Sequence, residues 1–427
     1  MSRRLFGTDG VRGAAGEVLT GELALRLGHA VTRELSASRV LVIRDTRESG
    51  PMLEAALAAG VAAAGGDVLL GGVLPTPAAP LLVDRYGLDL AAVISASHNP
   101  YGDNGIKFFG GEGFKLTDEA EARIERRLDE PVAGTPIGRV DALHGTEEDY
   151  LRALHTRFQA LDLSNRRILL DCANGATHQV APEIFRRLGA TVTVVADEPD
   201  GRNINDGCGS THVDALDVAG HDAAFAFDGD GDRVLAKDRT GTVVDGDELL
   251  ALATLRRKAP GVAVTVMTNY GFHRAMADAG VEVATTKVGD RYVLEELRAR
   301  GWELGGEQSG HLIDMAFVPS GDGIAAALLT LEALDGGDLA DRGAMEKLPQ
   351  RLVNVPVADR DAAMADAELA EAVERESTGL EGRGRVLVRP SGTEQLVRVM
   401  VEAPSAEEAD EVCSRLVGIV ETSSTRV

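Results

Sequence analysis

Short apolar runs alternate along the chain with segments in which apolar residues recur every three or four positions. Runs of four or five aliphatic residues predict buried strands, whereas the longer period predicts amphipathic helices. In the first part of the chain the predicted order is helix 21–35, strand 40–43, helix 52–64, strand 67–70, strand 91–94 and helix 118–128. The proline-bearing stretch 74–80 is expected to be irregular. This succession is typical of an α/β domain.

The same succession recurs twice further along the chain. The second set is strand 167–170, helix 182–188 and strands 191–195 and 223–227; the third is strand 262–267, helix 272–279 and strands 281–284 and 302–304, followed by helix 323–334. The repeated order predicts three related α/β domains whose loops face one central cleft.

A smaller α+β domain is predicted after a linker at 336–347. Its elements are strands 351–357, 385–388 and 396–401, helix 362–375, and a last helix that begins with a capping box of Ser405 and Glu408. The four predicted domains cover residues 1–150, 151–250, 251–345 and 346–427.

Length and composition narrow the class of protein. A chain of 427 residues is too long for one ordinary core, and a net charge of −24 argues against a nucleic-acid or anionic-membrane partner. The cysteines Cys172, Cys208 and Cys413 are too widely spaced for a disulfide framework or a metal site, which favours a reducing compartment. With no apolar leader and no long apolar run, we expect a cytoplasmic enzyme without a membrane span.

Candidate chemistry begins where strand 91–94 ends, at SASHNP. Ligand sites in open α/β sheets gather at the carboxyl ends of strands, so Ser97, beside His98 and Asn99, is a candidate nucleophile. A polar turn that only caps backbone groups is the alternative.

The motif DGDGDR carries three alternating carboxylates, at Asp228, Asp230 and Asp232. Intervening glycines allow such a loop to curl around one hard cation, which predicts a Mg²⁺ site. A calcium EF-hand would need Gly and Glu where the chain has Arg233 and Arg239. An acidic hairpin without metal is the other alternative, and carboxylate repulsion opposes it.

Three further segments suit a phosphorylated polyol. In RPSGTE, small residues beside Arg389 allow backbone N–H groups to form an anion-binding nest, although a simple hairpin turn has the same pattern. In GGEQSGH, the polar residues Glu307, Ser309 and His311 suit sugar hydroxyl groups. The glycine-rich FGTDGVRG, which carries Asp9 and Arg12, is expected to approach a ligand closely.

Together these loops predict phosphoryl transfer on a phosphosugar. A serine hydroxyl is a poor nucleophile, but as a phosphoserine held against Mg²⁺ it is a phosphoryl donor. Lys107, Arg12 and Arg233 would neutralise the charge that spreads over the transferring group.

The motifs FGTDGVRG, SASHNPYGDNGIKFF, DGDGDR, GGEQSGH and RPSGTE, in this order over nearly the whole chain, resemble the alpha-D-phosphohexomutase superfamily. The resemblance implies four domains around a central cleft and a phosphoserine at Ser97, with Lys107 as general acid/base near Arg12. It also implies Mg²⁺ held by Asp228, Asp230, Asp232 and a phosphate oxygen on Ser97, sugar contacts from Glu307 and Ser309, and a grip on the non-reacting phosphate by Arg389, Ser391, Gly392 and Thr393.

Within the superfamily, Gln308 and Asp290 resemble the branch that acts on glucosamine phosphates rather than the mannose branch. The implied reaction interconverts glucosamine 6-phosphate and glucosamine 1-phosphate through a 1,6-bisphosphate, a step toward UDP-N-acetylglucosamine and cell-wall precursors. Asp290 is the candidate for recognising the amino group, unless it only caps the helix that begins near Arg291. Gln395 departs from the family's usual proline but removes no phosphate ligand.

Other classes of function stay open from the sequence. A phosphomannomutase or phosphoglucomutase would share all the motifs. A metal-dependent sugar phosphatase would need an aspartate nucleophile or an activated water, and a non-catalytic sensor would bind without turnover. The sequence does not decide the oligomeric state.

Overall fold

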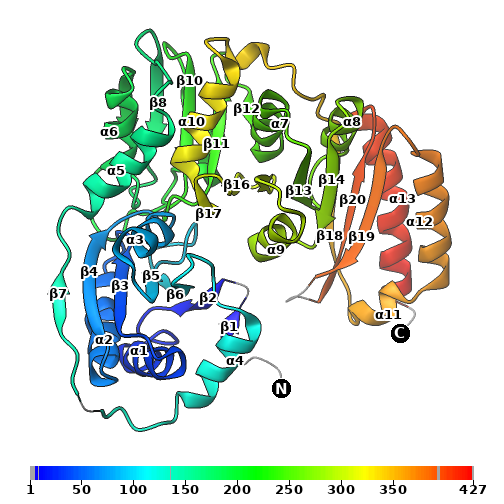
Figure 1. The fold of residues 1–427 in the computed structure, drawn as a ribbon. Helices are drawn as coiled ribbons and strands as arrows, with labels where there is room; N and C mark the ends of the chain where they lie inside the picture. Colours follow the sequence, from blue (N-terminus) through cyan, green and yellow to red (C-terminus); the bar gives the residue numbers. More distant parts are fainter. Residues whose placement is uncertain (1–4, 8, 135, 392–394, 426–427) are drawn as a thin grey trace. The chain divides into compact units, whose positions relative to one another are not determined.

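A computed structural model describes residues 5–7, 9–134, 136–391 and 395–425. They form two compact units, described separately below. The large unit comprises Met1–Met267 and Val281–Arg342, and the small unit comprises Thr268–Gly280 and Gly343–Val427. Figure 1 labels their helices and strands.

The first sheet of the large unit has seven strands in the order β1-β2-β6-β5-β3-β4-β7. Its strands are β1 (Phe6–Gly7), β2 (Gly10–Ala14), β3 (Arg39–Arg44), β4 (Asp67–Val73), β5 (Leu90–Ile94), β6 (Asp103–Gly110) and β7 (Val140–Ala142). Helices α1 (Gly21–Leu35), α2 (Gly50–Ala63) and α4 (Asp118–Arg127) share one hydrophobic core with this sheet, and α3 (Ala78–Tyr86) packs against β3 and β5. Because β3 and β5 are parallel, the loops after both strands lie at the same edge.

Two five-stranded mixed sheets complete the large unit, in the orders β12-β11-β10-β8-β9 and β14-β13-β15-β16-β17. The second sheet contains β8 (Arg167–Asp171), β9 (Thr191–Val195), β10 (Ala223–Phe227), β11 (Val234–Asp238) and β12 (Val243–Val244), with helices α5 (Thr146–Arg157) and α6 (Val180–Arg187) and the 3₁₀ turn Ser210–Ala215. The third contains β13 (Gly261–Thr265), β14 (Glu282–Thr286), β15 (Leu304–Gly306), β16 (Leu312–Asp314) and β17 (Val318–Gly321), with α7 (Gly246–Arg257), α9 (Asp290–Arg300), α10 (Gly323–Leu334) and the 3₁₀ turn Leu339–Asp341.

The small unit is built on an antiparallel sheet of the order β18-β20-β19. Its elements are β18 (Gln350–Pro356), β19 (Arg385–Pro390), β20 (Leu396–Glu402), α8 (Tyr270–Asp278), α11 (Arg360–Met364), α12 (Ala367–Gly379) and α13 (Ala406–Thr425). The backbone N–H of Glu408 donates to Ser405 Oγ at 3.2 Å, so Ser405 caps α13 as predicted. The fold class, three α/β domains and a smaller α+β domain, is confirmed; the exact domain boundaries and the fourth domain's share of the cleft remain predictions.

The sequence prediction was wrong or incomplete at several elements. The stretch expected to be irregular leads directly into α3, because a proline in the first turn, here Pro80, gives up no helical hydrogen bond. The predicted helix 362–375 is two helices, since Asp366 caps a second start at α12. The third set's last strand is β15, shifted two residues from 302–304. Elements β6, α5 and α7 were not predicted.

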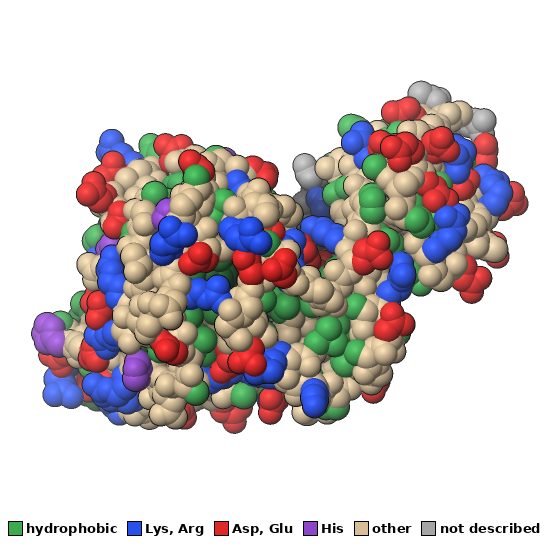
Figure 2. All heavy atoms as spheres, turned by 90° about the horizontal axis from the view of Figure 1, so that it is seen from above, with side chains coloured by type: hydrophobic (Ala, Val, Ile, Leu, Met, Phe, Trp, Pro, Cys, Tyr) green, Lys and Arg blue, Asp and Glu red, His purple; other side chains and the backbone are tan. Residues whose placement is uncertain are grey.

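The surface charges and the cysteines of the structure agree with what the composition predicts. On the face drawn in Figure 2, acidic and basic side chains are interspersed. Cys172, Cys208 and Cys413 are free, as predicted. In the described part of the chain, every helix is too short or too polar to traverse a bilayer.

Helices α1 and α2 cross in close backbone contact. A Cβ atom at Gly60 would collide with the carbonyl oxygen of Leu25, and one at Gly28 with that of Leu57. The close crossing of the two helices therefore requires glycine at both of these positions. Because α1 and α2 form one side of the core under β3 and β5, this contact supports the strands that carry the candidate site.

We predict that Gly60→Ala destabilises the protein by on the order of 2 kcal/mol, because the added methyl group forces two packed backbones apart. Gly418→Ala is the matched control: Gly418 lies in α13 with open space where a Cβ would stand. Its better helix propensity should leave stability unchanged or raise it by about 0.5–1 kcal/mol. Urea or thermal unfolding of both variants measures the difference, and equal effects would contradict the close-contact account.

Candidate active site

Ser97 lies in the loop that follows β5, at the strand's carboxyl end. Its side chain is buried, and Oγ donates a 2.5 Å hydrogen bond to Asp228 Oδ2. The backbone of Ser97 has φ = 53°, in the left-handed region that a non-glycine residue enters at a cost of about 1–3 kcal/mol. The contact joins the first sheet's loop to the loop after β10 of the second sheet, so the predicted nucleophile and metal motifs do meet.

Asp228, Asp230 and Asp232 form one buried cluster after β10. One ligand oxygen from each lies within 4.8 Å of the others. Within the described residues, Asp230 Oδ1 and Asp232 Oδ1 are buried and have no hydrogen-bond partner. Burial and the neighbouring carboxylates raise the pKa of Asp228 well above its usual range. Unpartnered buried oxygens and mutual repulsion fit a hard divalent cation, and these three residues could hold it.

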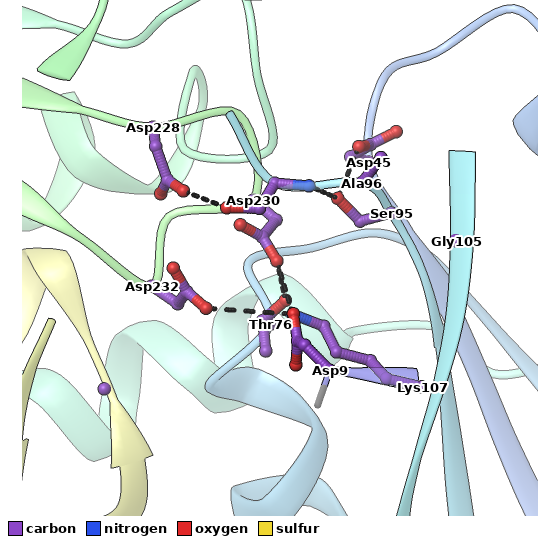
Figure 3. A network of polar contacts seen from close by, with 12 residues as sticks. Asp9, Asp45, Thr76, Ser95, Ala96, Gly105, Lys107, Asp228, Asp230 and Asp232 are labelled. Carbon is purple, nitrogen blue, oxygen red and sulfur yellow. Dashed lines mark hydrogen bonds and ion pairs between the residues drawn. The ribbon is translucent and has the colours of Figure 1, made fainter. Parts of the chain in front are cut away.

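Lys107 projects from β6 into this cluster (Figure 3). Its Nζ lies 2.7 Å from Asp230 Oδ2 and 3.7 Å from Asp232 Oδ2. Although burial opposes its charge, Asp230, Asp9 and Asp232 raise the pKa of Lys107 above its usual value. Thr76 Oγ1 donates to the same Asp230 oxygen at 2.6 Å. Lys107 is therefore a buried, charged ammonium in the cluster, beside the Ser97 loop.

Two guanidinium groups flank the Ser97 loop. Arg12 pairs with Asp9 and donates to the carbonyl oxygen of Ala96 at 3.3 Å. Arg233 lies 3.4 Å from Nδ1 of His98, which is itself 3.4 Å from Ser97 Oγ. Burial, with the charges of Arg233 and Arg12, lowers the pKa of His98, so this imidazole is neutral between the two cations. The arrangement suits a group with several negative charges.

A cavity of about 410 Å³ opens beside this cluster in the large unit, and all three sheets contribute loops to it. The side chains that carry its chemistry are Asp9, Arg12, Lys115, Asp232, Arg233, Asp290, Glu307 and His311. Glu307 Oε1 accepts a hydrogen bond from the backbone N–H of Gly289 at 3.0 Å. The N–H of Gly321 donates to His311 Nε2, so the imidazole carries its proton on Nδ1, 3.6 Å from Asp232 Oδ2.

Not every predicted site residue lies at this cavity. Ser309 is exposed and does not line it. Arg389 and Ser391 belong to the small unit, where Arg389 stands directly opposite Arg398 on β20 and Ser391 is buried. Burial and Arg398 lower the pKa of Arg389. Gly392 and Thr393 fall outside the described residues.

The sequence did not single out Lys115 or Thr76. Lys115 Nζ bridges Asp9 Oδ1 and Asp290 Oδ2, each at 2.5 Å. Asp9 belongs to the glycine-rich motif that was expected to approach a ligand, whereas Lys115 stands in a polar stretch with no periodic signal. Their juxtaposition depends on the docking of the first domain on the third, which no local pattern encodes.

Comparison with protein families gives four matches that follow the chain in order. All four are described as phosphoglucomutase/phosphomannomutase: alpha/beta/alpha domain I over residues 3–133, domain II over 148–241, domain III over 245–353 and the C-terminal domain over 352–419.

Curated relatives align with nearly the whole chain. The phosphoglucosamine mutase of Pelotomaculum thermopropionicum is 48% identical, with 97% of this chain and 98% of the relative covered. That of Rubrobacter xylanophilus is 50% identical, with 97% and 96% covered. Among solved structures, a phosphoglucomutase/phosphomannomutase family protein from Burkholderia thailandensis superposes with a TM-score of 0.84 at 24% identity, with 97% of each chain covered. The last comparison supports the fold alone.

We predict that the aspartate cluster binds one divalent cation. Asp230→Asn should weaken Mg²⁺ or Mn²⁺ binding by at least about 100-fold, since even residues that only support metal ligands contribute 10–100-fold. Isothermal titration calorimetry measures the affinity. The control is Asp314→Asn, which removes a buried carboxylate of the third domain that pairs with Arg257. Unchanged affinity in Asp230→Asn, or an equal loss in the control, would contradict a metal site here.

Proposed function

The chain belongs to the phosphoglucomutase/phosphomannomutase family, and we propose that it acts as a phosphoglucosamine mutase. It would interconvert glucosamine 6-phosphate and glucosamine 1-phosphate, as the names of relatives at 48–50% identity indicate for those proteins. The observation that carries the proposal is the 2.5 Å contact between Ser97 Oγ and Asp228, which places a hydroxyl on a buried cluster of carboxylates.

In this proposal Ser97 carries the phosphoryl group between turnovers. Mg²⁺, held by Asp228, Asp230, Asp232 and a phosphate oxygen on Ser97, would supply charge neutralisation during transfer. Ser97 gives its phosphoryl group to the free hydroxyl of the bound sugar phosphate, whose proton leaves to a base. The product is a 1,6-bisphosphate; after the sugar reorients, Ser97 Oγ takes back the other phosphoryl group. No phosphate is lost over the cycle.

Cationic residues have separate tasks in the proposed cycle. Lys107, whose Nζ reaches the cluster that adjoins Ser97, would act as general acid and then base: its ammonium gives a proton to Ser97 Oγ as the phosphoryl group leaves, and the amine so formed takes the proton of the attacking hydroxyl. Arg12 and Arg233 would balance the charge of the transferring group, because both flank the Ser97 loop. At the sugar, Glu307, Ser309 and His311 would bind hydroxyl groups.

The non-reacting phosphate requires a second anion site. We propose the β19–β20 loop of the small unit for it, with Arg389, Ser391, Gly392 and Thr393 as ligands. Arg389 and Arg398 occupy directly paired positions on neighbouring strands, where like charges repel, and a bound phosphate would relieve that repulsion.

Two rival functions make different use of the same residues. A sugar phosphatase would pass the phosphoryl group to water, and a sensor would bind without turnover. The Ser97–Asp228 contact disfavours both, since it brings a serine hydroxyl, which can carry a phosphoryl group, to the carboxylate cluster. A glucose or mannose mutase differs only in sugar preference. Three free cysteines and the amino-sugar reaction favour the cytoplasm as the place of action.

We predict that purified protein carries phosphate on Ser97 in part of the molecules, which phosphopeptide mass spectrometry would detect. Ser97→Ala should lower mutase turnover by about 10³-fold or more, because the phosphoryl carrier is lost. Ser210→Ala, which removes another buried serine hydroxyl, is the matched control and should keep full turnover. Full activity without phosphate at Ser97 and without a bisphosphate activator would refute the mechanism.

We predict a preference for the amino sugar that depends on Asp290. An ammonium group and a hydroxyl have similar size, so discrimination needs a charge or a directed acceptor. Asp290 Oδ1 accepts the backbone N–H of Arg291 at 2.8 Å, while Oδ2 meets Lys115 at the cavity. Asp290 is the first residue of α9, whose N-cap is Gly289 without a side-chain cap hydrogen bond, so the carboxylate contacts the neighbouring backbone and the cavity but does not cap the helix. The guanidinium group of Arg291 pairs with Glu121. This pairing disfavours the alternative that Asp290 recognises the amino group by orienting Arg291.

The measurement is kcat/KM for glucosamine, glucose and mannose 1-phosphates. We expect the natural chain to prefer the amino sugar by about 10-fold or more, and Asp290→Asn to lose most of that preference. Glu282→Gln, which removes an exposed charge elsewhere in the third domain, is the control. Equal use of all three sugars by the natural chain would overturn the glucosamine assignment. An unchanged preference in Asp290→Asn would overturn only the role of that residue.

A further inference from the structure

The side chain of Arg47 is fully buried directly behind the loop that carries Ser97. Arg47 follows β3, and β3 lies beside β5 in the sheet, so the loops after the two strands are neighbours. Its Nε donates to Asp45 Oδ2 at 2.8 Å. Burying a guanidinium is unfavourable unless all its N–H groups are paired, so its other partners indicate what it is for.

The remaining four N–H groups of Arg47 all donate to backbone carbonyls of one short segment. One terminal nitrogen donates to Ser97 and Asn99, each at 2.8 Å. The other donates to Asp103 at 2.9 Å and to Pro100. All five donors of the group are therefore used. Because the planar guanidinium group is fixed by these hydrogen bonds, it also fixes the positions of the four carbonyl groups in loop 97–103.

Asp45 reaches the same loop through a second route. Its Oδ2 accepts the hydroxyl hydrogen of Ser95 at 2.6 Å, and Ser95 Oγ accepts the backbone N–H of Ser97 at 2.9 Å (Figure 3 shows Asp45 and Ser95). The N–H and the C=O of Ser97 are thus both held by one connected network. That network encloses the residue whose φ of 53° is intrinsically unfavourable.

We propose that Arg47 and Asp45 are positioning residues for phosphoryl transfer, which hold the backbone of Ser97 in its left-handed conformation and so direct Oγ at Asp228. This inference rests on the proposed function for its kinetic readout. Both side chains are fully buried behind the loop and their polar groups are taken up by the contacts above, so we assign neither to binding of the sugar. The network acts on where Ser97 stands, and displacement of a reacting group by about 1 Å can cost 100-fold in rate.

The tests are Arg47→Lys, Arg47→Met and Ser95→Ala. Lysine keeps the charge but has three donors on a compact group, so it cannot hold four carbonyls and a carboxylate together. Ser95→Ala removes only the hydroxyl that links Asp45 to Ser97. If the Arg47→Met protein does not fold, Ser95→Ala still tests the positioning role. The control is Arg257→Lys, at another arginine that pairs with a buried aspartate, outside the site.

For Arg47→Lys and Ser95→Ala we expect kcat to fall by about 100-fold and 10-fold respectively, with KM within about twofold of the natural value. The melting temperature should match that of the control. Hydrogen exchange of a peptide covering residues 95–104 should accelerate at least about tenfold, while exchange in the other domains stays the same. Exchange does not depend on the reaction, so it tests the positioning role even if the natural chain proves to have no mutase activity.

Three results would overturn the inference. The first is kcat within about threefold of the natural value in both variants. The second is a rise in KM that accounts for the whole loss of kcat/KM. The third is faster exchange throughout the chain with a lowered melting temperature, which would assign Arg47 to general stability.

Discussion

Repulsion among three buried carboxylates is the constraint on which the active site depends. Asp228, Asp230 and Asp232 stand within a few ångströms of one another, away from water, and each needs positive charge. Lys107 supplies part of it from β6, and among the described residues Asp230 Oδ1 and Asp232 Oδ1 still have no hydrogen-bond partner. A site of this kind is stabilised by what binds to it. The same excess of negative charge that opposes folding suits the cluster to a divalent cation.

The repeated α/β architecture explains how such a site is assembled from distant parts of the sequence. Each of the first three sheets ends parallel strands at one edge, and the loop beyond that edge carries one chemical function. The serine comes from the first sheet, the carboxylates from the second, and Glu307 and His311 from the third. The sheets supply the stability of each domain. The loops can therefore adopt backbone conformations, such as that of Ser97, that would be unfavourable in an isolated segment.

The sequence predicted those parts of the molecule that local patterns encode. Aliphatic runs located β5 and β10, and the residues that follow them identified Ser97 and the aspartates. It missed α3, because prolines that open a helix were interpreted as irregular structure, and β6, because Lys107 interrupts its apolar pattern while being buried itself. Lys115 and Arg47 were missed for another reason. Their roles come from pairings over long stretches of chain, and a charged residue gives no sign in the sequence that it will be buried.

In the proposed mechanism, Ser97 transfers its phosphoryl group to the sugar and not to water. The most direct test labels Ser97 with radioactive phosphate, removes free label, and mixes the protein with glucosamine 6-phosphate and Mg²⁺ in a rapid-quench instrument. The account predicts that label leaves the protein within the time of one turnover, appears in the sugar bisphosphate and monophosphates, and stays on the protein when a chelator replaces Mg²⁺. Label that is released as inorganic phosphate, or that remains on Ser97 while the sugar phosphates interconvert, would contradict it.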